Sequence, residues 1–487
     1  MSQAVDATAV SRVVGILTQF KDFGAGAVRF LPQRIALIGQ GCSLSSYSTD
    51  KRLVTSAAEV AARYGYGSPL HLASLMLFPL NGDGVGSIPV TVYPLEDDSA
   101  GVPAAGQIAA VGVQTETASY VIKCAEISVT VVVEEGDTAD EALTAIRTAI
   151  IGELNMPVIP GVIAAGALPL EAKWAGESGN DIVVEVEGDA YGITFTSTDC
   201  AGGLVNPDIQ DALDQIGQVW ETCIVNCLNY DDTTTLDLIQ TFGDGRWLPL
   251  EKKPLYAISG TGDDRATRTV ITDARDDDKI NVLMSAPGCN NLPAQIAARA
   301  AARVTKQAVN NPPQDYNSLL SGLVAGDDVD QEDYINRDLA VQAGSCTTIL
   351  TSGEIEMNDT VTMYHPEGEV PPAYRYLVDV VKLQNIVYNV RLIFESEDWK
   401  GSPLLPDSTP TVNPTAKKPK DALSALGNLA DNLALQAIIA DAEFTKESMV
   451  VQIDSQNPKR LNWTFPVKLS GNVEIVSGDI NFGFYFG

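Results

Sequence analysis

The most regular hydrophobic pattern in this chain of 487 residues lies in its last part, residues 449–487. Apolar and polar side chains alternate through residues 461–469 and again through residues 480–486. A period of two is typical of half-buried β-strands. An apolar strand left unpaired at a chain end favours aggregation, so we expect this block to pair with the chain's own body or with another chain. Its apolar members are Leu461, Trp463, Phe465, Val467, Leu469, Ile480, Phe482, Phe484 and Phe486.

The first hundred residues predict an arm that leads into an α/β fold. A short apolar run over residues 13–20 precedes a glycine-rich stretch, which indicates an arm with one strand and a hinge. Compact apolar runs then predict buried strands at residues 35–38 and 90–93. Helical patterns lie between these strands, at residues 57–62 and 69–78. Strands separated by helices are typical of an α/β domain.

The pattern changes near residue 98 and changes back near residue 206. Between these points, one helix at residues 139–151 interrupts a series of alternating strands, which predicts an inserted β-rich domain. Its strands are expected at residues 119–122, 127–133, 182–186 and 193–195. Afterwards strands and helices alternate as parallel βαβ units do. These strands are expected at residues 223–228, 255–258 and 280–283, and these helices at 209–220, 233–242, 264–273 and 293–309.

Past residue 345 the strands come first and the helices follow. A hairpin is expected from residues 347–350 and 354–363, and apolar spacings of three and four predict helices at 374–394 and 421–443. The predicted fold is therefore multidomain, of the α/β and α+β classes. Its expected parts are an N-terminal arm (1–30), an α/β domain (31–99 and 204–345), the inserted β-rich domain (100–203), and a C-terminal α+β domain with the terminal strand block (346–487).

Composition narrows the possible partners. The chain has 32 Lys and Arg against 63 Asp and Glu, and this negative field argues against nucleic-acid or anionic-membrane binding. The two ends differ from the middle: residues 1–34 carry a small positive charge and residues 446–487 are neutral. Such ends could lie against an acidic neighbour, although short segments also vary in charge by chance. No membrane helix or signal peptide is expected, and seven scattered cysteines indicate free thiols in a reducing cytoplasm.

No pattern of catalytic or metal-binding residues stands out. The only histidines, His71 and His365, lie in unlike contexts and indicate structural or surface roles. Residues 39–41 resemble the start of a dinucleotide fingerprint, but Leu44 stands where its third glycine belongs. Cys223 and Cys227 have no second pair at metal-ligand spacing and are expected to be buried core thiols. The acidic clusters at 327–333 and 276–278 are interpreted as solvated loops. We therefore predict a protein that is not an enzyme and needs no cofactor or metal.

Several stretches, in this order and spacing, resemble the tail sheath proteins of contractile-tailed phages, especially the Mu-like kind. One runs from Glu332 through Gly344 and a short strand to the Thr-x-Tyr ending at Tyr364. Asn358 and Asp359 stand where that family usually has an arginine. The others are the long helix at 374–394, residues 172–182 with the preceding 136–138, and the terminal strand block.

The resemblance implies a structural subunit of a virion. Sheath subunits stack as hexameric rings in a helix around a tail tube, and contraction drives the tube through the host envelope. The implied partners are further copies of the chain, the tail tube protein, and baseplate and tail terminator proteins, with no nucleic acid and no membrane. Assembly in the host cytoplasm and genome ejection through the contractile tail follow from the same resemblance.

The resemblance also implies that terminal arms add strands to the sheets of neighbouring subunits. The residues expected in these inter-subunit arms are Val13, Val14, Ile16, Leu17, Phe20, Trp463, Phe465, Val467, Ile480, Phe482, Phe484 and Phe486. The family's tube-facing element is its C-terminal helical region, which makes Lys417, Lys418 and Lys420 the candidate tube-facing residues here. Two alternatives remain open: residues 480–486 could join the body's own sheet while residues 13–20 alone exchange, or the chain could be an α/β nucleotide-using enzyme with a β-rich accessory domain.

Overall fold

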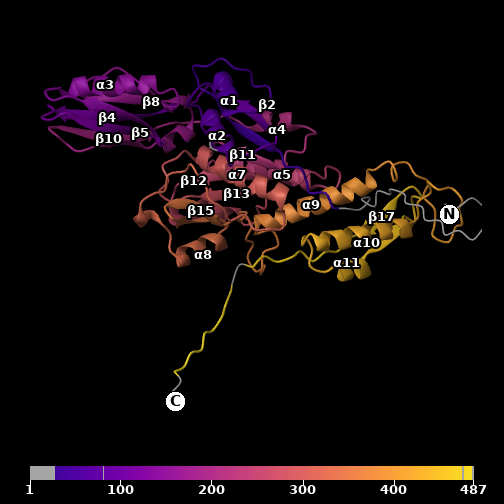
Figure 1. The fold of residues 1–487 in the computed structure, drawn as a ribbon. Coiled ribbons are helices and arrows are strands. Elements are labelled where there is room, and N and C mark those ends of the chain that lie inside the picture. The colour runs from indigo at the N-terminus through magenta and orange to yellow at the C-terminus, as the bar shows by residue number, and fades with distance from the viewer. Residues whose placement is uncertain (1–27, 81, 474–475, 485–487) are drawn as a thin grey trace, which may run out of the picture. The chain divides into compact units, whose positions relative to one another are not determined.

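The computed structural model describes residues 28–80, 82–473 and 476–484, and the chain divides into two compact units (Figure 1). The larger unit draws on Phe30–Tyr388 and Gly471–Gly487, and the smaller on Met1–Arg29 and Asn389–Ser470. The predicted arm residues Val13, Val14, Ile16, Leu17 and Phe20, and also Phe486, lie outside the described residues. The domain boundaries expected from the sequence stay a prediction.

A six-stranded sheet in the order β13-β12-β11-β1-β3-β2 forms the centre of the larger unit. Five strands run parallel, and only the short edge strand β2 pairs antiparallel, with β3. Each residue of the five parallel strands is buried, as expected for strands covered on both faces. This confirms the predicted mixed α/β core. The strands are β1 (Ile35–Gln40), β2 (Arg52–Val54), β3 (Val90–Leu95), β11 (Cys223–Asn226), β12 (Tyr256–Thr261) and β13 (Asn281–Ser285).

Helices cover both faces of this sheet. On one face α2 (Pro69–Leu77) and α7 (Pro293–Asn310) pack on the strands, with α1 (Ala57–Tyr64) against α2. On the other face lie α4 (Gln210–Ile216) and α5 (Thr233–Trp247). The short helix α6 (Arg265–Thr272) and the 3₁₀ turn η2 (Asp273–Arg275) lie between β12 and β13 in the chain.

Two helices differ in length from the prediction because of glycines. Helix α4 ends at Ile216 rather than near residue 220, since Gly217 takes a φ of 55° that other residues rarely adopt. Helix α5 instead continues through Gly243 to Trp247. A Cβ at Gly243 would lie 2.5 Å from the side chain of Ile280, so this glycine permits close packing on the sheet rather than stopping the helix.

The segment inserted between β3 and β11 contains two antiparallel sheets. One has the order β10-β4-β8-β7 and the other β6-β5-β9, and α3 (Ala139–Gly152) packs on both. Thr138 caps α3 and forms a complete capping box with Glu141. The strands are β4 (Pro103–Gly112), β5 (Ala118–Cys124), β6 (Ile127–Val133), β7 (Val158–Pro160), β8 (Ala167–Ala175), β9 (Val184–Glu187) and β10 (Ile193–Ala201), with a 3₁₀ turn η1 (Glu177–Asp181).

The last part of the larger unit covers one edge of the main sheet. The predicted hairpin forms as β14 (Thr347–Thr351) and β15 (Glu354–Asp359), although its second strand ends before residue 363. Cys346 N donates to Leu283 O on the edge strand β13. This contact shields an edge that could otherwise pair with another chain. The 3₁₀ turn η3 (Asp328–Asp330) and the helix α8 (Tyr334–Gln342) precede the hairpin, and the long predicted helix α9 (Leu377–Phe394) follows it.

Two acidic stretches that the sequence indicated as solvated loops contribute buried charges instead. Glu332 lies 2.7 Å from the guanidinium group of Arg268, whose side chain is fully buried. Asp278 is also fully buried and accepts hydrogen bonds from Arg275 and Asn281. The interpretation was wrong for Glu332 because folding brings its cation, Arg268, from elsewhere in the chain. For Asp278 the cation is local, since Arg275 lies three residues earlier, but a run of acids does not reveal that folding buries this pair.

The smaller unit combines helices with one hairpin. It contains α10 (Pro419–Leu435), α11 (Ala442–Ser448), and the antiparallel strands β16 (Val450–Ile453) and β17 (Leu461–Thr464). The single helix predicted at 421–443 is wrong in extent, because the chain turns at Ala437, whose φ is 54°. The side chains of Leu426, Leu429 and Leu433 are buried along one stripe of α10, whereas Leu423 in the same predicted stripe is 40% exposed.

Candidate assembly surfaces

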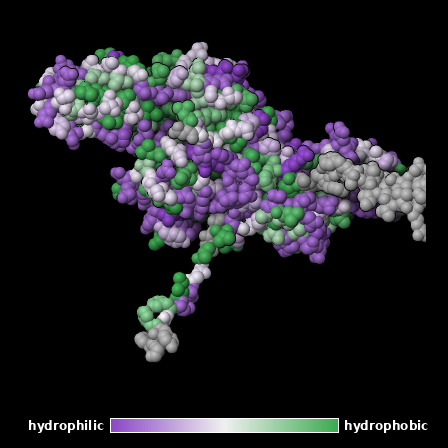
Figure 2. Space-filling view, viewed as in Figure 1, coloured by the Kyte–Doolittle hydropathy of each residue, from purple (hydrophilic) through white to green (hydrophobic). Residues whose placement is uncertain are grey.

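The C-terminal residues 476–484 hold apolar side chains in solvent. Ile480, Phe482 and Phe484 are 93%, 84% and 80% exposed, and Figure 2 shows apolar surface along this segment. The rings of Phe482 and Phe484 lie edge to face, with their centroids 6.2 Å apart. The predicted strand at 480–486 is not formed over the described residues 480–484 of the single chain, where the backbone has no regular structure. A β-strand needs a hydrogen-bonded neighbour, which a second chain could supply.

The hairpin of β16 and β17 is the second surface with unused pairing capacity. It is a sheet of two strands, so among the described residues each strand has one edge without a neighbouring strand. Trp463 on β17 is 39% exposed and stacks on Phe394, with the ring planes 15° apart. Phe465 and Val467 follow the strand and are half-buried. β16 packs against α10, which supports the hairpin, and an added strand would pair with an edge that has no neighbouring strand in the described part of the chain.

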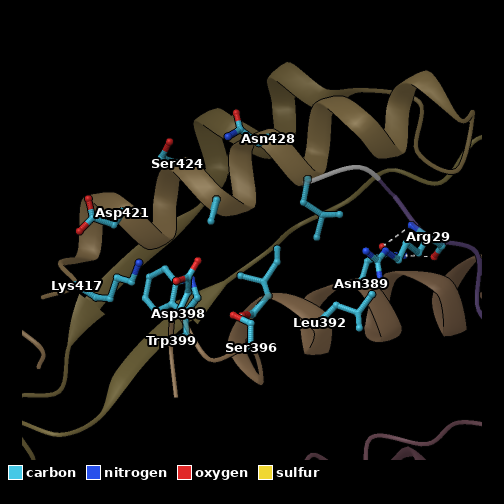
Figure 3. A pocket seen from close by; sticks show the side chains of 13 residues that line it. Arg29, Asn389, Leu392, Ser396, Asp398, Trp399, Lys417, Asp421, Ser424 and Asn428 are labelled. Atoms are coloured by element: carbon cyan, nitrogen blue, oxygen red, sulfur yellow. Dashed lines mark hydrogen bonds between the residues drawn. The ribbon is translucent and has the colours of Figure 1, made fainter. Parts of the chain in front are cut away.

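A groove of about 550 Å³ lies between the end of α9 and α10 in the smaller unit (Figure 3). Lys417 lines it and places its ammonium group 5.4 Å from the ring centre of Trp399. The Lys418 ammonium donates to Thr409 O instead, and Lys420 is exposed at the start of α10. Of the three lysines expected to face a tube, only Lys420 therefore has its side chain largely in solvent.

The carboxyl edge of the main sheet is where α/β enzymes bind their ligands, at the point where strand order reverses. Here that point lies between β1 and β11, and the insertion occupies it. Gln40 at the end of β1 donates 2.6 Å bonds to Ala175 O and Asp97 Oδ1. Asn229 after β11 donates to Asp181 Oδ2 of η1 at 2.9 Å. The chain's own insertion thus fills the place that a nucleotide would take, which weighs against the nucleotide-using alternative.

His71, Cys223 and Cys227, which the sequence raised as candidate functional residues, are all buried. His71 is buried, its Nδ1 accepts from Gly67 N, and burial lowers its pKa to about 4. Cys223 and Cys227 are buried core thiols, and burial raises the pKa of each. Reactive thiols need a lowered pKa, so these two are inert.

No group of three His, Cys, Asp or Glu side chains among the described residues is placed to hold a metal ion. No helix in the described ranges combines the length and apolar character needed to cross a membrane.

The sequence did not indicate three polar residues that bond to one another or to the backbone of Leu31, close to the two chain ends. Lys382 and Asn385 are fully buried on α9, and Asn472 bonds to Lys382 just before the exposed C-terminal segment. Lys382 and Asn385 lie among the apolar positions that predicted α9, so the apolar period hid them. A lysine and an asparagine three apart on a buried helix are a signal that could have found this site.

Comparison with known proteins identifies the class that this chain resembles, the tail sheath proteins of Mu-like phages. The chain is 25% identical over 443 residues, or 88% of each sequence, to a curated relative. That relative is the Mu-like prophage FluMu tail sheath protein of Haemophilus influenzae. The resemblance predicted from the sequence motifs is therefore confirmed. No protein-family model matches the chain.

Solved structures with similar backbones include two sheath tail proteins. The one from Desulfitobacterium hafniense has 14% identity and a TM-score of 0.48, covering 93% of this chain and 100% of that protein. The one from Listeria innocua has 12% identity and a TM-score of 0.49, with coverages of 92% and 95%. A chain of the anti-feeding prophage baseplate has 10% identity and a TM-score of 0.48, with coverages of 98% and 100%.

Proposed function

We propose that this chain is the structural subunit of a contractile tail sheath. Copies stack as hexameric rings in a helix around a tail tube, and contraction of the stack drives the tube through the host envelope. The curated relative is a tail sheath protein and matches 88% of the chain, which supports this assignment. The role is mechanical, and no catalytic step is involved.

The observation that carries the proposal is a pair of complementary surfaces on one chain. Residues 476–484 expose alternating apolar side chains, and the β16–β17 hairpin has edges without neighbouring strands. An extended segment that adds to a sheet edge gains main-chain hydrogen bonds, and its side-chain pockets set the register. In this proposal the terminal segment of one subunit extends the hairpin of another.

The apolar side chains would supply most of the energy of each link. Fully burying one large apolar side chain contributes about 1.5–3 kcal/mol, and Ile480, Phe482 and Phe484 are each at least 80% exposed in the single chain. Each link is therefore modest, but a lattice repeats it in every subunit, and repeated links act together. Such links can hold while the bodies of the subunits slide between two arrangements.

The remaining contacts of the sheath follow from the same role. We propose that α10 with Lys417, Lys418 and Lys420 faces the tube, and that the ends of the stack meet baseplate and tail terminator proteins. The N-terminal residues Val13, Val14, Ile16, Leu17 and Phe20 would form a second arm, and Trp463, Phe465 and Val467 would line the receiving hairpin. Assembly of these parts would take place in the host cytoplasm.

The test compares the full chain with one that lacks residues 476–487. We expect electron microscopy to show rings or tubes for the full chain and none for the shortened one. Thermal unfolding of the two should agree, because residues 476–484 form no helix or strand with the body. Tubes that survive the deletion would disprove strand exchange by this segment. A full chain that stays monomeric under all conditions would disprove the sheath assignment itself.

A further inference from the structure

Helix α9 carries polar side chains where its position in the fold calls for apolar ones. Lys382 and Asn385 are both fully buried, and their spacing of three places them on one side of the helix. A buried ammonium group is costly unless it is paired and hydrogen-bonded, so Lys382 needs specific partners. The hydrogen-bond partners of Lys382 and Asn385 show which parts of the chain these side chains hold.

One partner of Lys382 comes from the C-terminal end of the chain. The Lys382 ammonium donates to Asn472 Oδ1 at 2.8 Å and to Asp379 Oδ1 at 2.9 Å. The amide nitrogen of Asn472 in turn donates to Pro313 O at 2.9 Å. The next residue, Val473, is 84% exposed. The chain therefore changes from a doubly held residue to an exposed one within a single step.

Asn385 holds the backbone at Leu31, near the start of the larger unit. Its Oδ1 accepts a buried 2.8 Å hydrogen bond from Leu31 N, and its Nδ2 donates to Val381 O. In the smaller unit, Asn389 bonds to both backbone groups of Arg29, accepting from its N–H and donating to its carbonyl (Figure 3). Side-chain amides that pair with a backbone in this way hold it as a neighbouring strand would.

We propose that Lys382 and Asn385, together with Asn472, form a clip that fixes the points at which both terminal segments leave the body. The inference rests on the proposed strand exchange and adds the residues that position the arms. A strand joins a sheet in one register only, because a slip of one residue turns every side chain to the opposite face. A fixed exit point restricts the space that the arm explores and raises its effective concentration at the correct edge.

The clip can be tested on the unassembled chain, independently of sheath formation. All seven native cysteines are buried, so spin labels will attach selectively to Val473→Cys and Asp328→Cys, both at exposed positions of the larger unit. We expect a narrow distance distribution in the parent chain and a distribution at least twice as wide with Asn472→Ala. Lys382→Met should broaden it less, because Asn472 keeps its bond to Pro313 O. The double variant should be no wider than Asn472→Ala alone, because that change already breaks the contact with Lys382. Equal widths in all four proteins would overturn the proposal.

An assembly assay then distinguishes a failure of the clip from a failure of the sheath assignment. Asn472→Ala should raise the concentration needed for assembly by about tenfold, as expected for lost hydrogen bonds to a charged donor. It should also lower the melting temperature, because the buried Lys382 ammonium loses an acceptor. Asn413→Ala is the matched control, since Asn413 is exposed and its side chain bonds within its own loop. If the parent chain assembles and Asn472→Ala assembles equally well, the clip is wrong. If the parent chain never assembles, the sheath assignment fails while the distance measurement still decides the clip.

Discussion

Asp181 is a carboxylic acid whose surroundings favour its neutral form. It ends the turn η1 of the insertion and accepts a hydrogen bond from Asn229, which follows β11. Burial, with a smaller contribution from the negative charges of Asp231 and Asp263, raises the pKa of Asp181 to about 7. The junction between the insertion and the main sheet is therefore sensitive to pH.

Asp181→Asn should remove that sensitivity. Between pH 4 and 7 the folded protein binds a proton at Asp181 that the unfolded chain releases, so this side chain makes stability fall as pH rises through that window. We expect the variant to match the parent at pH 4 and to exceed it by about 1–3 kcal/mol at pH 8. Denaturant unfolding at both pH values measures the difference. Asp189→Asn, at an exposed position, is the control, and parallel pH profiles of parent and Asp181→Asn would contradict the account.

At the residue scale, the sequence predicts side chains whose surroundings are local. The capping box of α3 joins Thr138 to Glu141, only three residues away, so a local sequence pattern can indicate it. Glu332 was misinterpreted as solvated because its partner, Arg268, is distant in the sequence. The polar residues of α9 were missed for the same reason: Lys382 finds Asn472 ninety residues later. Long-range pairing of buried polar groups leaves no trace in local composition.

At the element scale, periodicity predicted the five parallel strands of the main sheet and most helices, because each buries one continuous run or one stripe. The short edge strand β2 of this sheet was not predicted. Strands β4 and β8 were not predicted. β4 is rich in Ala and Gly, and β8 has three Ala and one Pro, all residues of low strand propensity. Pairing of β4 with β8 and with β10 stabilises them. The terminal strand was predicted from its pattern but lacks a partner over its described residues, so pattern alone does not make a strand.

The exposed terminal segment gives an element-scale prediction. Replacing Phe482 and Phe484 together with Asp should abolish assembly, because two charges would have to be buried in the new strand's apolar contact. The melting temperature of the single chain should stay within about 1 °C of the parent, since both side chains are at least 80% exposed. Leu250→Asp is the matched control, at an apolar residue that is 92% exposed in a loop. Sedimentation and electron microscopy give the readout, and normal tubes from the double variant would refute the role of this segment.

At the scale of the whole molecule, the insertion and the α/β sheet meet at the carboxyl edge, where α/β enzymes bind their ligands. There Gln40 and Asn229 bond to residues of the insertion, which occupies the ligand crevice of the sheet. The sequence motifs predicted the sheath resemblance, which the curated relative confirms over 88% of the chain. The motifs could not predict which strands and segments lack a hydrogen-bonded neighbour, because that depends on contacts between parts of the chain that are distant in sequence.

The most direct measurement of the central claim is a cryo-electron microscopy map of the assembled protein that traces residues 476–484. The account predicts a tube of stacked sixfold rings in which this segment of one subunit forms a strand on the β16–β17 hairpin of a neighbour. Ile480, Phe482 and Phe484 should then lie in an apolar contact between subunits. A map in which the segment returns to its own subunit, or stays exposed in a well-ordered tube, would contradict the account.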